Sequence, residues 1–110
     1  MSTYRPIVII ESPYAGDVVT NVAYARKCIR DSIDRGESPF ASHLLYTQPG
    51  VLDDSVHGER ELGLAAGWEF YRVADYVAIY TDLGTSEGMI RGAARGVRAG
   101  ITVKRRQIGA

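Results

Sequence analysis

Four short apolar runs rich in β-branched or aromatic residues alternate along the chain with segments whose apolar residues recur at helical spacing. Ile7–Ile10 and Tyr76–Tyr80 are the clearest runs, and residues 39–45 and 101–104 complete the expected strands. Continuous runs of this kind are typical of strands covered on both faces. A helix between successive strands implies right-handed crossovers and a parallel sheet. The chain is therefore predicted to be an α/β protein.

The expected helices span residues 18–35, 59–73 and from residue 86 to Gly100, with Asp17 as a predicted N-cap and Gly36 ending the first helix. The fold predicted is a single three-layer domain over residues 1–110, with four parallel strands in a flavodoxin- or Rossmann-like βαβαβαβ arrangement and the order 2-1-3-4. The residues expected to face the sheet are Val18, Val22, Ala25, Ile29 and Ile33 in the first helix, Leu62, Ala66, Phe70 and Val73 in the second, and Met89, Ala93 and Val97 in the third.

Length and charge limit the classes of function. The chain has 110 residues and a formal net charge of zero, which argues against binding to a nucleic-acid polymer. No apolar run approaches the roughly 18 residues that a membrane helix needs, so no membrane partner is expected. Cys28 is the only cysteine and excludes a disulfide framework. These features predict a cytoplasmic protein.

Residues 82–89 (Asp-Leu-Gly-Thr-Ser-Glu-Gly-Met) connect the third expected strand to the third helix. Ligands of open parallel sheets bind beyond the carboxyl ends of strands, and a helix N-terminus offers amides to an anion. Ser86 is also a good N-cap, so capping alone could explain it. We expect a ligand site here, in which the candidate residues are Asp82, Gly84, Thr85, Ser86, Glu87, Gly88 and Met89.

Polar groups follow the other expected strands as well. Tyr14 could stack on a base or simply cover the sheet edge, and His43 could be catalytic or structural. Arg60 could bind an acid or a phosphate, or pair with a neighbouring glutamate on the surface. Together with the segment above, the predicted ligand-binding residues are Ser12, Pro13, Tyr14, His43, Asp54 and Arg60.

Glycine recurs at every fourth position of the third expected helix and its flanks, and the second helix repeats the spacing. An interior helical glycine costs about 1 kcal/mol relative to alanine, so such a face suggests close approach of another element. Tight packing on the sheet and a subunit interface are equally good explanations; under the second, the chain would form a homo-oligomer. The glycines are Gly84, Gly88, Gly92, Gly96 and Gly100, with Gly63 and Gly67.

Several common motifs are absent. The chain has no P-loop, no G-x-G-x-x-G after the first strand and no G-x-S-x-G elbow. His43, His57, Asp53 and Asp54 lack the spacing of a metal site, so we predict neither a metal nor a cofactor.

Five segments together resemble the small nucleoside 2-deoxyribosyltransferase-like family that is often found in phages and mobile elements. They are Ile9–Tyr14, His43–Tyr46, Leu52–Asp54, Glu59–Gly63 and Asp82–Met89, in the expected order. The resemblance implies a compact, usually oligomeric α/β domain that binds a nucleoside or nucleotide, in the host cytoplasm if phage-encoded. Its relatives include 2′-deoxynucleoside 5′-phosphate N-hydrolases.

In those hydrolases, an S-x-G turn holds the phosphate, and a glutamate four residues after its glycine attacks the anomeric carbon. Ser86–Gly88 matches the turn, but the position of the glutamate falls on Gly92, which has no side chain. Glu87 is then the nearest candidate nucleophile, with Asp82 as its acid–base partner; Glu11 and Asp54 are more remote candidates.

Three classes of function remain open. The chain could hydrolyse or transfer at an N-glycosidic bond, or capture a nucleotide or nucleotide-derived signal without turnover. The absence of glutamate at position 92 favours capture, whereas the retained carboxylates favour chemistry. A structural oligomer without a ligand is the third class.

Overall fold

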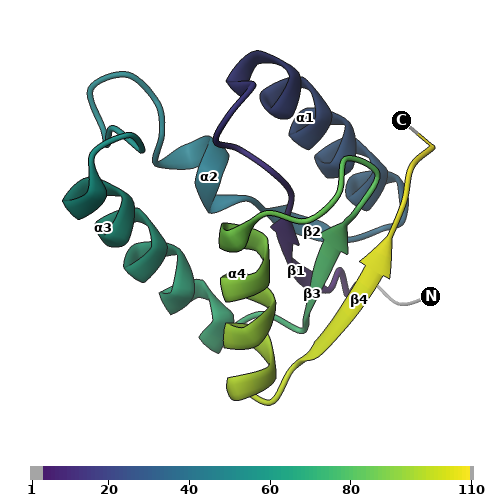
Figure 1. The fold of residues 1–110 in the computed structure, drawn as a ribbon. Coiled ribbons are helices and arrows are strands. Elements are labelled where there is room, and N and C mark those ends of the chain that lie inside the picture. Colours follow the sequence, from purple (N-terminus) through teal and green to yellow (C-terminus); the bar gives the residue numbers. More distant parts are fainter. Residues whose placement is uncertain (1–3, 110) are drawn as a thin grey trace.

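The computed structural model describes residues 4–109 and contains a four-stranded sheet. All strand pairs are parallel, and the order is β2-β1-β3-β4, which confirms the predicted fold class and topology (Figure 1). The strands are β1 (Ile7–Glu11), β2 (Ser38–Phe40), β3 (Tyr76–Tyr80) and β4 (Thr102–Arg106).

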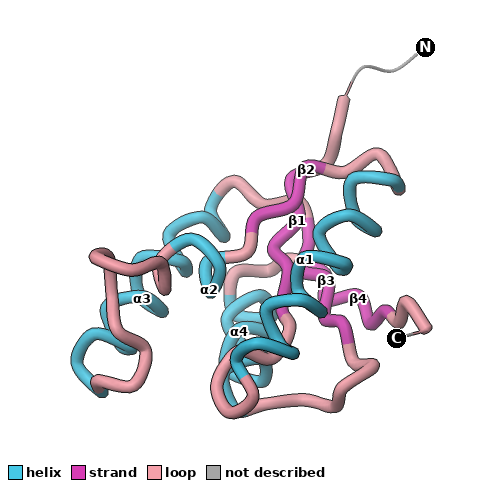
Figure 2. Tube along the Cα trace, turned by 90° about the horizontal axis from the view of Figure 1, so that it is seen from above, coloured by secondary structure: helices cyan, strands magenta, loops and turns pink. Residues whose placement is uncertain are grey.

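Helices cover both faces of this sheet (Figures 1 and 2). One face packs against α1 (Val18–Asp34), and the other packs against α4 (Glu87–Arg98) and the short 3₁₀ helix η1 (Glu69–Arg72). α3 (His57–Trp68) precedes η1, and α2 (Ser42–Leu45) follows β2. No helix within residues 4–109 is long and apolar enough to cross a bilayer.

The alternating residues of β1 and β3 divide the core between the two faces. Val8 and Ile10 pack towards α1, where they meet Tyr24 and the buried Cys28. Ile9 and Val77 face the opposite way and pack against Tyr71 of η1. Burial on both faces explains why these strands read as unbroken apolar runs in the sequence.

The second predicted strand was too long. β2 ends at Phe40, and residues 42–45 form α2 instead, with the amides of Leu44 and Leu45 bonded to the carbonyl of Ala41. His43 is therefore presented by a helical turn rather than by a strand. β2 also lies at the sheet edge, so its outer side lacks a neighbouring strand that would extend it.

The predicted inward stripe of α1 was partly wrong, although its capping was not. Asp17 accepts a hydrogen bond from the Thr20 amide, and Gly36 follows the helix with a φ of 86°. Among the predicted residues, Val18 and Ile33 are exposed. The residues that are buried instead are Asn21, Tyr24, Ala25, Cys28 and Ser32. The polar groups among them, on Asn21, Tyr24 and Ser32, are all hydrogen-bonded.

The stripe predicted for residues 59–73 was also wrong, and the α-helix ends at Trp68, where the more tightly wound η1 begins. Leu62, Phe70 and Val73 are all exposed. The buried side chain of this region is Tyr71, which the helical periodicity did not indicate.

In α4 the glycine face packs on the sheet. Gly92 and Gly96 are buried, whereas Val97 of the predicted stripe is exposed. A Cβ atom on Gly96 would lie 2.8 Å from Cγ2 of Val77, so β3 and α4 approach as closely as their backbones permit. This packing accounts for both glycines within one chain, and oligomerisation through them stays a prediction.

The basic run of Lys104, Arg105 and Arg106 near the C-terminus predicts a solvated tail rather than a phosphate clamp, and the structure contradicts this prediction for Arg106. Its guanidinium donates to both carboxylate oxygens of Glu37, at 2.7 and 2.6 Å, and both side chains are nearly inaccessible. Burial alone would raise the pKa of Glu37, but hydrogen bonds from Arg106, Tyr76 and Ser32 hold it at about 2. Lys104 and Arg105 are exposed on β4, the other edge strand.

Replacing Gly96 with alanine tests the close approach of α4. We expect Gly96→Ala to lower the free energy of unfolding by about 1–3 kcal/mol, because the stiff, buried Val77 cannot yield without repacking. Gly58→Ala is the matched control, since Gly58 is also helical and a Cβ there would meet nothing within 4 Å. Urea unfolding measures both, and an equal effect of the two substitutions would contradict the packing argument.

Candidate functional site

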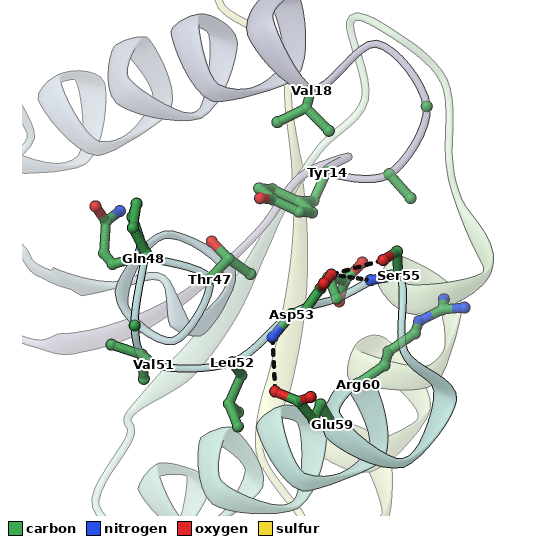
Figure 3. Close-up of a pocket in the computed structure, with 15 residues that line it drawn as sticks. Tyr14, Val18, Thr47, Gln48, Val51, Leu52, Asp53, Ser55, Glu59 and Arg60 are labelled. Atoms are coloured by element: carbon green, nitrogen blue, oxygen red, sulfur yellow. Dashed lines mark hydrogen bonds between the residues drawn. The ribbon is translucent and has the colours of Figure 1, made fainter.

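An open cleft of about 950 Å³ lies between the loop after β1 and the segment that leads into α3 (Figure 3). Tyr14 and Val18 line one side, and Val51, Leu52 and Arg60 line the other. One wall is ordered by short hydrogen bonds: the Asp53 amide donates to Glu59 at 2.9 Å, as Figure 3 shows. The cleft combines apolar side chains such as Val18, Val51 and Leu52 with polar ones such as Thr47 and Asp53, which suits a flat heterocycle carrying polar substituents.

A smaller cavity of about 90 Å³ continues inward from this cleft. The two share Tyr14, Ala15, Asp54 and Arg60, so they form one connected depression that narrows towards the sheet. The inner cavity lies at the carboxyl end of β1 and beside the start of α4, where parallel α/β folds bind ligands. Its remaining lining consists of Glu11, Ser12, Ser42, His43, Leu64, Trp68, Tyr71, Ser86, Gly88 and Met89.

Glu11, the last residue of β1, brings a carboxyl group to the inner end of this cavity. Its Oε2 accepts a hydrogen bond of 3.0 Å from the hydroxyl of Tyr71, which also lies 3.0 Å from the carbonyl oxygen of Gly92. Burial raises the pKa of Glu11 to about 8, and the hydrogen bond from Tyr71 offsets only part of the shift. The group is therefore mainly a neutral acid at pH 7.

Ser12, Tyr14 and His43 form the side of the cavity next to α2. The Ser12 hydroxyl lies 2.8 Å from Nε2 of His43, and the ring of Tyr14 meets that of His43 edge-on with centroids 6.4 Å apart. Burial lowers the pKa of His43 to about 4, so the imidazole is neutral at pH 7. His43 is therefore a hydrogen-bonding group and not a source of positive charge.

The rim beside α4 has the features of an anion site. Ser86 caps the helix, and its Oγ accepts a hydrogen bond from the amide of Met89 at 3.3 Å. The amides of Glu87 and Gly88 lie in the first turn, where the helix itself offers them no acceptor. Nη2 of Arg60 lies 4.0 Å from where a side chain on Gly88 would begin. No carboxylate in the described part of the chain forms an ion pair with Arg60.

Asp54 lines the cleft, the inner cavity and a third, smaller pocket of about 50 Å³ beside Tyr46 and Gly63. Its carboxylate is half-buried. A carboxylate in that position can accept hydrogen bonds from sugar hydroxyls or from the amino group of a base.

The structure brings most of the predicted ligand-binding residues to the inner cavity. They are Ser12, Tyr14, His43, Asp54, Arg60, Ser86, Gly88 and Met89. Pro13, Gly84 and Thr85 do not line it: Pro13 is buried beside it, and Gly84 turns the chain with a φ of 84° in the exposed loop before α4.

Neither predicted catalytic residue lies in the cavity. Asp82 accepts hydrogen bonds from the hydroxyl of Tyr24 at 2.6 Å and from the amides of Ile108 and Gly109, and so joins α1 to the segment after β4. Glu87 is largely exposed and lies 4.0 Å from Arg91. Asp82 therefore has a structural role and Glu87 faces solvent, whereas the acids that line the cavity are Glu11 and Asp54.

Trp68 and Tyr71 are site residues that the sequence analysis did not identify. The helical spacing puts Arg91, Arg95 and Arg98 opposite the glycines and predicts a solvated face, but Arg91 and Arg95 lie over the ring of Trp68, 5.5 and 5.4 Å from its centroid. Arg91 also makes a bidentate pair with Glu61 of α3, at 3.0 and 2.9 Å. These contacts fasten α3 to α4 and so hold the far wall of the cavity. The sequence signal that could have identified Trp68 and Tyr71 is the pair of large aromatic residues near the end of the second predicted helix.

Comparison with known protein families matches residues 6–106 to DUF7768, described as a domain of unknown function. The match covers nearly the whole chain, so the chain belongs to this family. No curated protein matches the sequence.

The raised pKa of Glu11 predicts a pH-dependent stability. Between the unfolded value of about 4.3 and the folded value of about 8, the folded chain binds more protons, so this contribution is full at low pH and lost as pH rises. The stability of wild type relative to Glu11→Gln should therefore fall between pH 5 and 9. Urea unfolding measures it, with the exposed Glu69→Gln as control. Parallel curves for wild type and Glu11→Gln would contradict the shift.

Proposed function

We propose that this member of the DUF7768 family binds a nucleoside or nucleotide and cleaves or transfers at its N-glycosidic bond, as the nucleoside 2-deoxyribosyltransferase-like proteins that its sequence resembles do. One observation carries the proposal. A wide cleft with apolar walls narrows into a small cavity that contains an enclosed carboxyl group and has a helix N-terminus at its rim. Such an arrangement offers separate surroundings to a base, a sugar and a phosphate.

The base would occupy the wide cleft. Tyr14 provides an aromatic face, and Val18 on one side and Val51 and Leu52 on the other provide apolar surface (Figure 3). Stacking on an aromatic ring tolerates any base because every base has a π-face. Selection among the bases would therefore depend on hydrogen bonds with groups such as Asp54.

The phosphate would lie against the start of α4. Ser86, the amide of Gly88 and the guanidinium of Arg60 converge there. A helix N-terminus and an arginine without a carboxylate partner both stabilise a dianion, the first through its dipole and the second through charge-assisted hydrogen bonds.

Capture without turnover is the second candidate, and a specific observation favours it. Position 92 is glycine, and the two predicted catalytic carboxylates, Asp82 and Glu87, lie outside the cavity. A protein with this pocket that lacked a reacting carboxyl would hold a nucleotide or a nucleotide-derived signal and release it unchanged.

Incubation with deoxynucleosides and their 5′-monophosphates, followed by chromatography for free base, separates the two candidates. Release of base supports the enzyme. A thermal shift with a nucleotide but without free base supports capture. If neither appears with any of the four bases, both forms of the proposal fail.

Arg60 provides the test of the phosphate site. We expect Arg60→Gln to weaken binding of a deoxynucleoside monophosphate about tenfold or more, because a charge-assisted hydrogen bond contributes about 1.5–3 kcal/mol, and to leave binding of the matching nucleoside nearly unchanged. Calorimetric titration measures both affinities. Arg30→Gln, which removes an exposed guanidinium paired with Asp34 on α1, is the control. Equal losses for nucleotide and nucleoside would place the phosphate elsewhere.

A further inference from the structure

We propose that Glu11 is the reacting carboxyl of this site, that it donates a proton to the departing base, and that Gly92 is glycine because Glu11 occupies its side-chain space. The inference rests on the proposed function and deepens it, since it names the residue that would perform the chemistry. It replaces the two predicted catalytic residues, Asp82 and Glu87, with one that lies in the cavity.

The packing of β1 against α4 is the first step of the argument. A Cβ atom on Gly92 would lie 2.2 Å from Oε2 of Glu11, 2.4 Å from its Cδ and 2.8 Å from its Oε1. The whole carboxyl group therefore stands where any side chain at position 92 would begin. Strand β1 supplies the inner cavity with an acid at a place that helix α4 leaves vacant, and a side chain at position 92 would displace the carboxyl group from it.

The hydrogen bonds of Glu11 are the second step. Tyr71 donates to Oε2, whereas no described residue donates to Oε1. Within residues 4–109, every fully enclosed side-chain nitrogen or oxygen has a partner. Oε1 therefore retains access to the cavity that Glu11 lines, and it is the atom available to a ligand.

The electrostatic surroundings are the third step. Loss of water raises the pKa of Glu11 to about 8, and no cation among residues 4–109 contacts the carboxyl to oppose this. Arg91 and Arg95 of α4 are held over the ring of Trp68, from where Arg95 acts on Tyr71 rather than on Glu11 directly. The other titratable or charged groups around the cavity are Tyr71 from η1, His43 from α2, Asp54 from the loop and Arg60 from α3. An enclosed carboxyl that is neutral at pH 7 can act as a general acid.

The proposed step conserves atoms and charge. The proton on the Glu11 carboxyl moves to a ring nitrogen of the base as the bond between that base and C1′ breaks, and the bonding electron pair stays with the base. Water then adds to C1′, and its proton returns to the Glu11 carboxylate. The products are free base and the sugar or sugar phosphate, and Glu11 is again protonated.

Base release in single turnover with a deoxynucleoside monophosphate, measured alongside the thermal shift for the same compound, tests the role. Glu11→Gln should lower the rate at least about 100-fold, within the usual range for general acid catalysis, and retain the shift. The wild-type rate should decrease as pH rises through about 8. Glu69→Gln on η1, outside the cavity, should behave as wild type.

Gly92→Ala is a second variant that leaves the Glu11 carboxyl chemically intact but displaces it. Its rate should fall at least about tenfold with the thermal shift retained, and adding Gly92→Ala to Glu11→Gln should cause little further loss, because both changes act on one group.

The outcomes separate this inference from the proposed function. Binding without base release in wild type overturns proton donation by Glu11 and leaves capture standing. Base release that survives Glu11→Gln, or that increases with pH through about 8, overturns the role of Glu11 while the enzyme proposal holds. No thermal shift with any nucleotide overturns both.

Discussion

The two missing side chains at Gly92 and Gly96 determine how closely α4 lies on the sheet, and the rest of the site depends on that distance. At Gly96, the helix backbone meets Val77 of the central strand. At Gly92, it meets the end of Glu11 instead, so the same close approach that packs the core also encloses a carboxyl group. Arg91 and Arg95 extend from the other side of the helix to Trp68 and draw α3 towards the sheet. The cavity is the space that remains between these elements.

Because burial increases inwards, the depression changes from charged groups in its outer part to neutral hydrogen-bonding groups at its inner end. Where the wide cleft meets the inner cavity, Arg60 and Asp54 are half-buried, and solvent partly screens their charges. Deeper inside, His43 and Glu11 have both lost water, and each is shifted towards its neutral form at pH 7. A ligand that entered would meet charged groups at its outer end and neutral hydrogen-bonding groups at its inner end.

The sequence was sufficient for the fold because the strongest signals were local. Ile7–Ile10 and Tyr76–Tyr80 are buried on both faces, and their consecutive apolar residues indicate this burial directly. The helix faces were harder to predict. In α1, the buried side includes Asn21 and Ser32, polar residues that become acceptable inside only because distant partners satisfy their hydrogen bonds. Hydrophobic periodicity cannot predict such hydrogen-bond partners, because they are distant in the sequence.

The same distinction divides the site residues. Ser12, Tyr14, Ser86 and Gly88 follow strands or begin a helix, so topology alone brought them to one edge of the sheet. Asp82 shares that position in the sequence, yet Tyr24 and the amides beyond β4 hold its carboxylate elsewhere. The importance of Glu11 depended on a residue more than eighty positions away, since only the absence of a side chain at Gly92 leaves room for it. Pairings of that kind become visible only in three dimensions.

The outer strand β4 has a consequence for how copies of this chain can meet. Its free edge presents unpaired backbone donors and acceptors, which invite a strand from another molecule. Lys104 and Arg105 are exposed along this strand, and Lys104 also lies over the ring of Tyr76 at 3.8 Å. Two such edges aligned side by side would place like charges opposite one another, which is unfavourable. Pairing between the β4 edges of two molecules is thereby disfavoured.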